Sequence, residues 1–139
     1  RHNGVVKTHD GSALENGNYL DIVICDNLQT IKPSCKVVFI EEAQFFDASD
    51  LYKSVSQWLS EGKRVHVYGL VGDFKQQTFG GIAQLLPIAD EVTFLKAMCQ
   101  RCKDGTPAPF SILKESLEQP QYNPGGGEKY MSVCRACLN

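Results

Sequence analysis

The sequence predicts an α/β fold: a parallel sheet with helices, followed by a small β domain held by cysteines. Apolar runs at residues 36–40 and 63–70 are typical of buried strands, and an amphipathic segment at 49–61 lies between them. A strand, a helix and a strand in this order form a βαβ unit, whose two strands run parallel. Helical periodicity ends near the first Cys-x-x-Cys pair, and short β-like runs follow. We therefore expect one domain at residues 1–97 and a second at residues 98–139.

The segment at residues 49–61 is expected to be a helix because its apolar side chains recur on one face. Leu51 and Trp58 lie on this face, and Trp58 is expected to pack between the helix and the sheet. Ser49 can cap the first turn. Gly62 follows the last turn, where glycine is favoured because it adopts a positive φ without steric cost.

Three further elements are expected from short apolar runs. Residues 20–25 and 91–96 resemble strands, and residues 80–86 resemble a short helix. Cys25 and Cys35 lie in apolar surroundings, and we expect both to be buried as small residues.

The composition is that of an ordinary globular protein. The chain has 139 residues, of which 42% are hydrophobic and 22% charged, and its formal net charge is -2. A protein that grips nucleic acid would favour a basic face, so we expect no nucleic-acid partner. No stretch approaches the roughly 20 apolar residues of a membrane-spanning helix, and no signal peptide is visible, so no membrane association is expected.

Four of the six cysteines form two Cys-x-x-Cys pairs, Cys99 with Cys102 and Cys134 with Cys137. Each pair presents two thiolates from one tight turn, and two pairs complete the tetrahedral shell that zinc prefers. Four protein ligands leave no open position, so the predicted zinc is structural and would stabilise a β domain too small for a core of its own. Such thiolates also indicate a reducing, cytoplasmic compartment. The alternatives are a disulfide pair or two unconnected thiol turns.

Two adjacent carboxylates follow the predicted strand at residues 36–40, in the sequence VVFIEEAQFF at residues 37–46. In open α/β sheets, ligands bind just beyond the carboxyl ends of the strands, which is where Glu41 and Glu42 are expected. Adjacent residues leaving a strand point to opposite sides, so one carboxylate can meet a metal ion or its water shell while the other accepts a proton. The alternative is a solvated strand end.

Aromatic residues accompany this carboxylate pair. Phe45 and Phe46 follow it directly, and Phe46 is expected in the core. Phe74 and Phe79 lie in the loop after the next strand, which opens on the same edge of a parallel sheet, and Tyr130 follows a run of three glycines. Aromatic side chains of this kind can line a binding site for a flat, uncharged ligand such as a nucleobase.

The motifs EEAQFF, LVGDFKQQTFGG, Cys-x-x-Cys and GGGEKYMSVCRAC, in this order, resemble the type II (zinc-containing, cytosolic-type) thymidine kinase family. The resemblance covers most of the chain and implies a P-loop-kinase-like α/β domain with a zinc-bound lasso domain. It implies transfer of the γ-phosphoryl group of ATP, with Mg²⁺, to the 5′-hydroxyl of thymidine or deoxyuridine, a salvage step for DNA synthesis. It also implies a homotetramer and thymidine triphosphate as a feedback ligand.

The resemblance implies roles for individual residues. Glu42 matches the catalytic base, and Glu41 matches an acidic position associated with Mg²⁺. Phosphoryl transfer asks mainly for positioning, charge neutralisation and a base, which agrees with these roles. The remaining matched positions contact the nucleoside, and they are Phe45, Leu70, Phe74, Phe79, Ser111, Gln121, Asn123, Gly125 and Tyr130.

One motif of the family is absent. A kinase of this type needs a phosphate-binding loop, G-x-x-x-x-G-K-[ST], and the sequence does not contain it. We expect that the gene product carries a P-loop ahead of Arg1 and that the 139 residues alone do not turn over ATP. Without the strand that bears this loop, open sheet edges and an exposed apolar face are expected.

Two other functions stay open on the sequence. A non-catalytic nucleoside-binding chain, paired with an intact kinase domain, would share the lasso and the aromatic pocket. A zinc-ribbon module that binds nucleic acid would share the cysteines, but the acidic charge balance counts against it.

Overall fold

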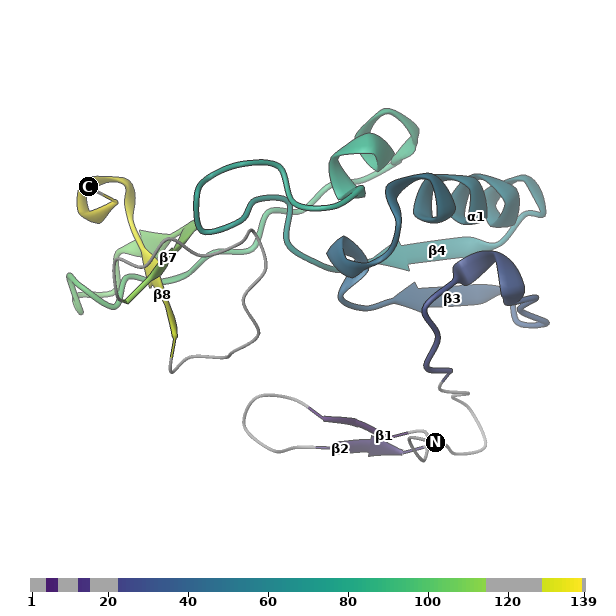
Figure 1. Ribbon diagram of the computed structural model, residues 1–139, viewed down its shortest axis with the longest axis horizontal. Coiled ribbons are helices and arrows are strands. Elements are labelled where there is room, and N and C mark those ends of the chain that lie inside the picture. The colour runs from purple at the N-terminus through teal and green to yellow at the C-terminus, as the bar shows by residue number, and fades with distance from the viewer. Residues whose placement is uncertain (1–4, 8–12, 16–22, 115–128, 139) are drawn as a thin grey trace.

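The computed structural model describes residues 5–7, 13–15, 23–114 and 129–138 (Figure 1). An α/β unit lies at one end of an elongated arrangement, and a cysteine-bound β unit lies at the other. Each unit has its own cluster of buried hydrophobic residues, and the two clusters share no member. A short antiparallel pair, β1 (Val5–Lys7) with β2 (Ala13–Glu15), precedes both in the chain.

The α/β unit contains the predicted βαβ arrangement. β3 (Val37–Ile40) pairs in parallel with β4 (Arg64–Val67), and Val37 lies opposite Arg64. α1 (Ala48–Ser60) connects the two strands and covers one face of the pair (Figure 1). The carboxyl ends of β3 and β4 therefore open on the same edge, as the sequence indicates.

α1 begins at a cap that differs from the predicted one. The side chain of Asp47, and not that of Ser49, accepts hydrogen bonds from the backbone N–H groups of Ser49 and Asp50, both at 3.0 Å. An aspartate here also places negative charge at the positive end of the helix dipole. Gly62 follows the last turn with a φ of +76°, as predicted. Within the described ranges, neither α1 nor any other helix is long and apolar enough to cross a membrane.

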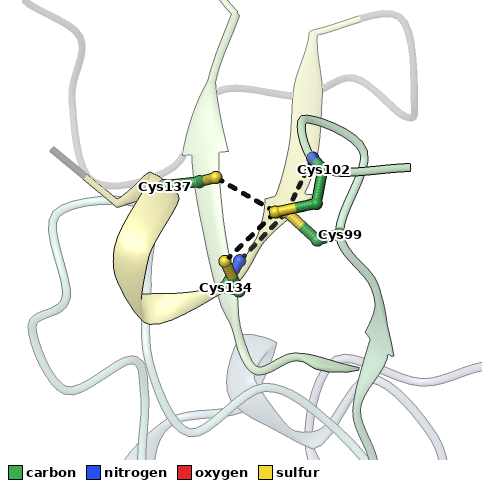
Figure 2. Close-up of side chains that lie close together, drawn as sticks. All are labelled: Cys99, Cys102, Cys134 and Cys137. Atoms are coloured by element: carbon green, nitrogen blue, oxygen red, sulfur yellow. Dashed lines mark hydrogen bonds between the residues drawn. The ribbon is translucent and has the colours of Figure 1, made fainter. Parts of the chain in front are cut away.

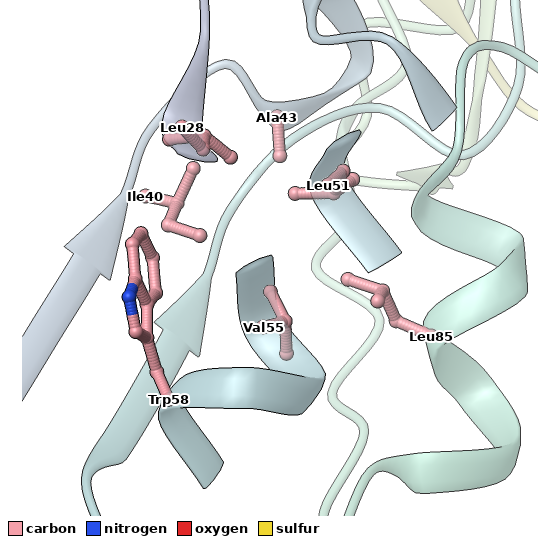
Figure 3. Close-up of a cluster of buried hydrophobic side chains, with 7 residues drawn as sticks. All are labelled: Leu28, Ile40, Ala43, Leu51, Val55, Trp58 and Leu85. Carbon is pink, nitrogen blue, oxygen red and sulfur yellow. The ribbon is translucent and has the colours of Figure 1, made fainter. Parts of the chain in front are cut away.

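The core of the α/β unit lies between α1 and the two strands (Figure 3). Trp58 is 3% exposed, which confirms its packing between helix and sheet, and Phe46 packs against the same cluster as expected. Burial of a large apolar side chain contributes about 1.5–3 kcal/mol relative to its exposure. The buried members of the cluster are Leu28, Ile40, Ala43, Leu51, Val55, Trp58 and Leu85.

A buried carboxylate joins α1 to the 3₁₀ turn η1 (Leu28–Thr30). Asp50 accepts hydrogen bonds from the backbone N–H groups of Leu28 at 2.7 Å and Gln29 at 3.0 Å. The hydroxyl of Ser54 donates to the same carboxylate at 3.1 Å. Three donors from two elements therefore depend on one side chain.

We predict that Asp50→Ala lowers the free energy of unfolding by about 2–3 kcal/mol, because buried donors lose their acceptor. Denaturation with urea measures the change. The matched control is Asp90→Ala at an exposed position, which should change stability by less than about 0.5 kcal/mol. Equal effects of the two substitutions would contradict this role of Asp50.

Two predicted strands do not form among the described residues. Residues 91–96 are irregular and exposed, with Leu95 at 84%, and the described part of the predicted strand 20–25, residues 23–25, is irregular too. A strand needs a neighbouring backbone to satisfy its hydrogen bonds. In the described part of the chain, β3 pairs with β4 alone, so these runs find no partner strand.

The remaining local predictions have mixed outcomes. The helix expected at residues 80–86 is present as the 3₁₀ helix η3 (Ile82–Ile88). Cys25 is half-buried, whereas Cys35 is exposed in a bend before β3, so its predicted burial is wrong. Cys35 stands between Ser34 and Lys36, and the bend that contains it faces solvent.

The face of the β3–β4 pair opposite α1 is apolar and uncovered in the described structure. Phe39 is 56% exposed, and its ring stacks on that of His66 with centroids 4.9 Å apart. Tyr68 extends the row at 6.4 Å from Phe39. Alternation along each strand explains this face, since Ile40 and its same-side neighbours point to the α1 core instead. The expectation of an exposed apolar face is confirmed for these residues.

The cysteine-bound unit is made of short antiparallel strands. β5 (Ala97–Met98) pairs with β6 (Pro107–Ala108), and β7 (Phe110–Leu113) pairs with β8 (Tyr130–Val133). A 3₁₀ turn, η4 (Arg135–Cys137), follows β8. Its small core contains only Cys99, Ala108, Val133 and Cys134 as buried residues among those described.

Candidate functional site

The four cysteines of the two Cys-x-x-Cys pairs converge on one point (Figure 2). Their sulfur atoms all lie within 4.8 Å of one another. The sulfur of Cys102 lies 3.4 Å from that of Cys137 and 3.7 Å from that of Cys134. A disulfide requires about 2.05 Å, so these are free thiols and the disulfide alternative does not describe them. A tetrahedral ion with metal–sulfur bonds of about 2.3 Å separates its sulfurs by about 3.8 Å, which is close to the 3.4 Å and 3.7 Å between Cys102 and its two neighbours.

Two backbone N–H groups stabilise negative charge on the sulfur of Cys99. The backbone N–H groups of Cys102, at 3.5 Å, and Cys134, at 3.3 Å, donate to the sulfur of Cys99. The Cys102 N–H, helped by that of Cys134, lowers the pKa of Cys99 to about 6. Contact with the Cys137 thiol, then with those of Cys134 and Cys99, raises the pKa of Cys102 to about 12. With four sulfur atoms this close together, the cluster can hold a metal ion.

Backbone and arginine contacts join the two halves of the cluster. The Arg101 guanidinium donates to the carbonyl oxygen of Cys137 at 2.6 Å. The backbone N–H of Gln100 donates to the carbonyl of Ser132 on β8 at 2.9 Å. Arg135 lies over the ring of Phe110 on β7, 4.1 Å from its centroid. The cysteine turns are thus fixed to the β7–β8 pair, which carries Ser111 and Tyr130.

The carboxylate pair lies at the carboxyl end of β3, as predicted. Glu41 and Glu42 are both exposed, and the two residues that follow them are buried. Glu42 has a left-handed backbone, with φ +53° and ψ +39°, which costs a non-glycine residue about 1–3 kcal/mol. This turn directs the chain inward, where the N–H of Ala43 donates to the carbonyl of Tyr68 at 3.0 Å. The Glu42 carboxylate accepts a hydrogen bond from the side-chain amide of Gln44.

Glycines allow the segment after Glu42 to lie close to the neighbouring loops. A Cβ at Gly69 would lie 2.4 Å from the side-chain oxygen of Gln44. A Cβ at Gly80, where φ is +60°, would lie 2.2 Å from the backbone oxygen of the same residue. The backbone at both glycines can therefore lie against Gln44, because neither glycine has a side chain in the way.

We predict that Gly80→Ala destabilises the protein more than Gly62→Ala does. Both glycines have a positive φ, at +60° and +76°, so each substitution carries similar backbone strain, about 1–2 kcal/mol. A Cβ at Gly62 meets nothing within 4 Å, whereas at Gly80 it would clash with backbone. Thermal unfolding of the two variants isolates the contact, and equal melting temperatures would contradict the close approach.

Aromatic side chains gather beside this strand end. Phe45 follows Gln44 and contacts Phe79 edge-on, with ring centroids 5.6 Å apart. Phe45 and Leu70 are 51% and 50% exposed, so both present apolar surface beside the strand end. Gln44 links this segment to the next loop, since the backbone N–H of Leu70 donates to its side-chain oxygen at 3.0 Å.

The loop between β4 and η3 is closed by a buried carboxylate. Asp73 accepts hydrogen bonds from the backbone N–H groups of Lys75 at 2.8 Å and Gln77 at 2.9 Å. Phe74 is held at the tip beside Tyr130 of β8, with ring centroids 6.0 Å apart. The side chain of Gln76 donates to the carbonyl of Ser111 on β7 at 3.4 Å. This loop therefore connects the strand ends of the α/β unit with the cysteine-bound unit.

Comparison with known proteins shows the family. The family model described as Thymidine kinase matches residues 1–138. The chain belongs to the thymidine kinase family. Thymidine kinase of Choristoneura fumiferana entomopoxvirus is 30% identical over 135 residues, covering 97% of this chain and 71% of the viral protein. Thymidine kinase of Mycoplasma mobile is 34% identical over 134 residues, covering 94% and 65%, and that of Oryza sativa subsp. japonica is 42% identical over 100 residues, covering 71% and 35%.

As a member of the thymidine kinase family, the chain is a nucleoside kinase, a transferase of phosphoryl groups. Its predicted site residues fall into two connected groups in the described structure. One joins Glu42, Phe45, Leu70 and Phe79 around Gln44, and the other joins Phe74, Ser111 and Tyr130 across the loop. Gln121, Asn123 and Gly125 lie outside the residues that the structure describes.

Two buried polar residues beside the predicted site residues have no role in the sequence-based prediction. Gln44 and Asp73 are both buried, at 3% and 7% exposure, and each organises a segment that bears predicted site residues. The available signal was a polar residue inside an apolar motif, since Gln44 stands between Ala43 and Phe45. Its partner Leu70 could not be read from the sequence, because that residue lies in another loop.

Proposed function

We propose that the complete gene product transfers the γ-phosphoryl group of ATP to the 5′-hydroxyl of thymidine or deoxyuridine, with Glu42 as the proton acceptor, and that the 139 residues alone do not turn over ATP. The family match supplies the reaction. The observation that carries the assignment is the position of Glu42, at the carboxyl end of β3 and hydrogen-bonded to a buried amide. Exposed Phe45 and Leu70 beside it offer apolar surface to a nucleoside.

In the proposed reaction, the nucleoside oxygen bonds to the γ-phosphorus as the bond to ADP breaks. The hydroxyl proton passes to the Glu42 carboxylate, so the products are ADP and the nucleoside monophosphate. Because the transition state is loose, the protein contributes chiefly by positioning the hydroxyl and receiving its proton. Mg²⁺, when bound with ATP, would neutralise charge on the phosphates. The exposed carboxylate of Glu41, next to Glu42 in the chain, could hold this ion.

The nucleoside is proposed to lie between the two groups of aromatic residues. Phe45, Phe79 and Leu70 would contact it from the α/β unit, and Phe74 with Tyr130 from the loop and β8. Apolar walls with a few convergent polar groups are typical of such sites. Ser111 on β7, together with Gln121, Asn123 and Gly125, completes the proposed set of nucleoside contacts.

The metal of the cysteine cluster is proposed to be a structural zinc ion. Four sulfur ligands suit zinc, and they leave no position for substrate. The two separate hydrophobic clusters support the division into a P-loop-kinase-like α/β domain at residues 1–97 and a lasso domain at residues 98–139. Free thiols in the cluster favour the cytoplasm as the compartment. A homotetramer and feedback by thymidine triphosphate belong to the same proposal.

The test is a phosphoryl-transfer assay on the complete gene product with ATP and a panel of nucleosides. Thymidine and deoxyuridine should be phosphorylated, and kcat/KM for deoxycytidine should be at least about 100-fold lower, because a site that pairs with one base edge rejects another. Thymidine binding without turnover would overturn the proposal in favour of a non-catalytic nucleoside-binding chain. Turnover without preference among the nucleosides would refute the substrate assignment.

A further inference from the structure

The side-chain amide of Gln44 connects the ends of β3 and β4. We propose that Gln44 is a positioning residue that fixes the Glu42 carboxylate and couples it to the loop that begins at Leu70. The inference rests on the proposed function, because it concerns the same carboxylate. It adds a residue that contacts neither ATP nor nucleoside in the proposal, and acts through Glu42.

The chemistry of the two partners allows only one orientation of the amide. The backbone N–H of Leu70 can only donate, so the amide atom 3.0 Å from it is the oxygen. The NH₂ group then faces Glu42 and donates to its carboxylate. A carboxylate oxygen accepts hydrogen bonds, so the NH₂ group of Gln44 is the complementary donor and fixes the orientation of the Glu42 side chain.

Burial keeps the amide in place although the carboxylate is exposed. Gln44 is 3% exposed, and leaving a buried polar group without a partner costs about 1–3 kcal/mol. Gly69 and Gly80 leave room for Gln44, because a Cβ atom at either position would clash with it. The amide is therefore a fixed point, and a flexible glutamate that hydrogen-bonds to it loses rotamer freedom before substrate arrives.

The backbone between the two residues supports the same arrangement. Glu42 adopts a left-handed conformation, which turns the chain back so that the side chain two residues later reaches the Glu42 carboxylate. The hydrogen bond from Ala43 to Tyr68 anchors the turn at β4. Strain at a proposed catalytic residue is thus sustained by buried contacts on both following residues.

The first test compares Gln44→Met with Gln57→Met in the complete gene product. Gln57 is the matched control, because its side chain also donates to a glutamate, Glu61, at 3.0 Å, but on the exposed side of α1. We expect Gln44→Met to lower kcat by about 10- to 100-fold with a smaller change in KM, since misplacement of the base acts on the reaction step. Gln57→Met should leave both constants within about 2-fold of the native values. A folded Gln44→Met protein with native kcat would overturn the inference.

The second test uses Gln44→Glu, which keeps the shape of the side chain and so covers the case in which Gln44→Met fails to fold. A protonated Glu at this position can accept from Leu70 and donate to Glu42, whereas an ionised one can only repel Glu42. The ratio of variant to native kcat should therefore rise as pH falls from about 8 to about 6. A ratio that does not change with pH in the folded variant contradicts a positioning role.

Glu42→Gln separates this inference from the proposed function. If Glu42→Gln keeps native turnover, the proposed role of Glu42 fails and the role of Gln44 fails with it. If Glu42→Gln loses turnover while the Gln44 variants keep it, only the positioning role is refuted.

Discussion

Glu42→Gln lowers kcat for thymidine phosphorylation by about 10²–10⁴-fold in the complete gene product, according to the proposed mechanism. The amide keeps the shape of the side chain but cannot accept the hydroxyl proton. Because the proton moves only in the reaction step, KM for the nucleoside should change much less than kcat. Steady-state kinetics with varied thymidine at saturating ATP measures both constants.

Thymidine binding by calorimetry is the control for the integrity of this variant, and its affinity should stay near the native value. Glu91→Gln, at an exposed position outside the strand end, is the matched substitution and should keep native kinetics. If Glu42→Gln retains kcat within about 5-fold of native, below the usual contribution of a general base, another group accepts the proton.

Cys134→Ala should release the proposed zinc ion and unfold the cysteine-bound unit, which contains β5 to β8. The described core of this unit has four buried residues, two of which are cysteines of the cluster, so little apolar burial remains once the metal is lost. Structural zinc supplies about 10–16 kcal/mol of apparent binding free energy in small metal-dependent domains, far more than this core can replace. Elemental analysis should find one zinc per native chain and less than about a tenth of that in the variant.

Cys35→Ala is the matched control for metal binding, because Cys35 is an exposed thiol outside the cluster. It should retain zinc and the native melting temperature. Since β8 carries Tyr130, loss of the metal should also weaken thymidine binding in Cys134→Ala. Full zinc content in that variant would contradict a four-cysteine site.

The parts of the fold that sequence predicts well are those with a local signal. The β3–α1–β4 unit follows from the alternation of apolar runs with a helical stripe, and Trp58 lies where that stripe indicates. The cysteine cluster follows from ligand spacing, because two adjacent thiols per turn restrict the geometry to few solutions. The position of Glu42 at the carboxyl end of β3 follows from the buried apolar run that precedes it, and in parallel sheets this is the end at which ligands bind.

The parts that sequence predicts poorly depend on partners distant in the chain. Residues 91–96 have strand character, yet they form no strand, because a strand requires a neighbouring backbone as well as suitable residues. Asp47 caps α1 in place of Ser49 because the helix already begins at Ala48, so the cap position lies two residues earlier than the apolar pattern indicates. Gln44 and Gly80 look unrelated in sequence, and their contact appears only when the loop after β4 packs against the strand end.

A crystal structure of the complete gene product with thymidine tests the central claim most directly. The distance to measure joins the Glu42 carboxylate to the 5′-oxygen of the nucleoside. The account predicts about 2.6–3.2 Å, the range in which a base can take the proton, with the pyrimidine between Phe79 and Tyr130. Thymidine bound with its 5′-oxygen beyond the reach of Glu42, or away from those two rings, would contradict it.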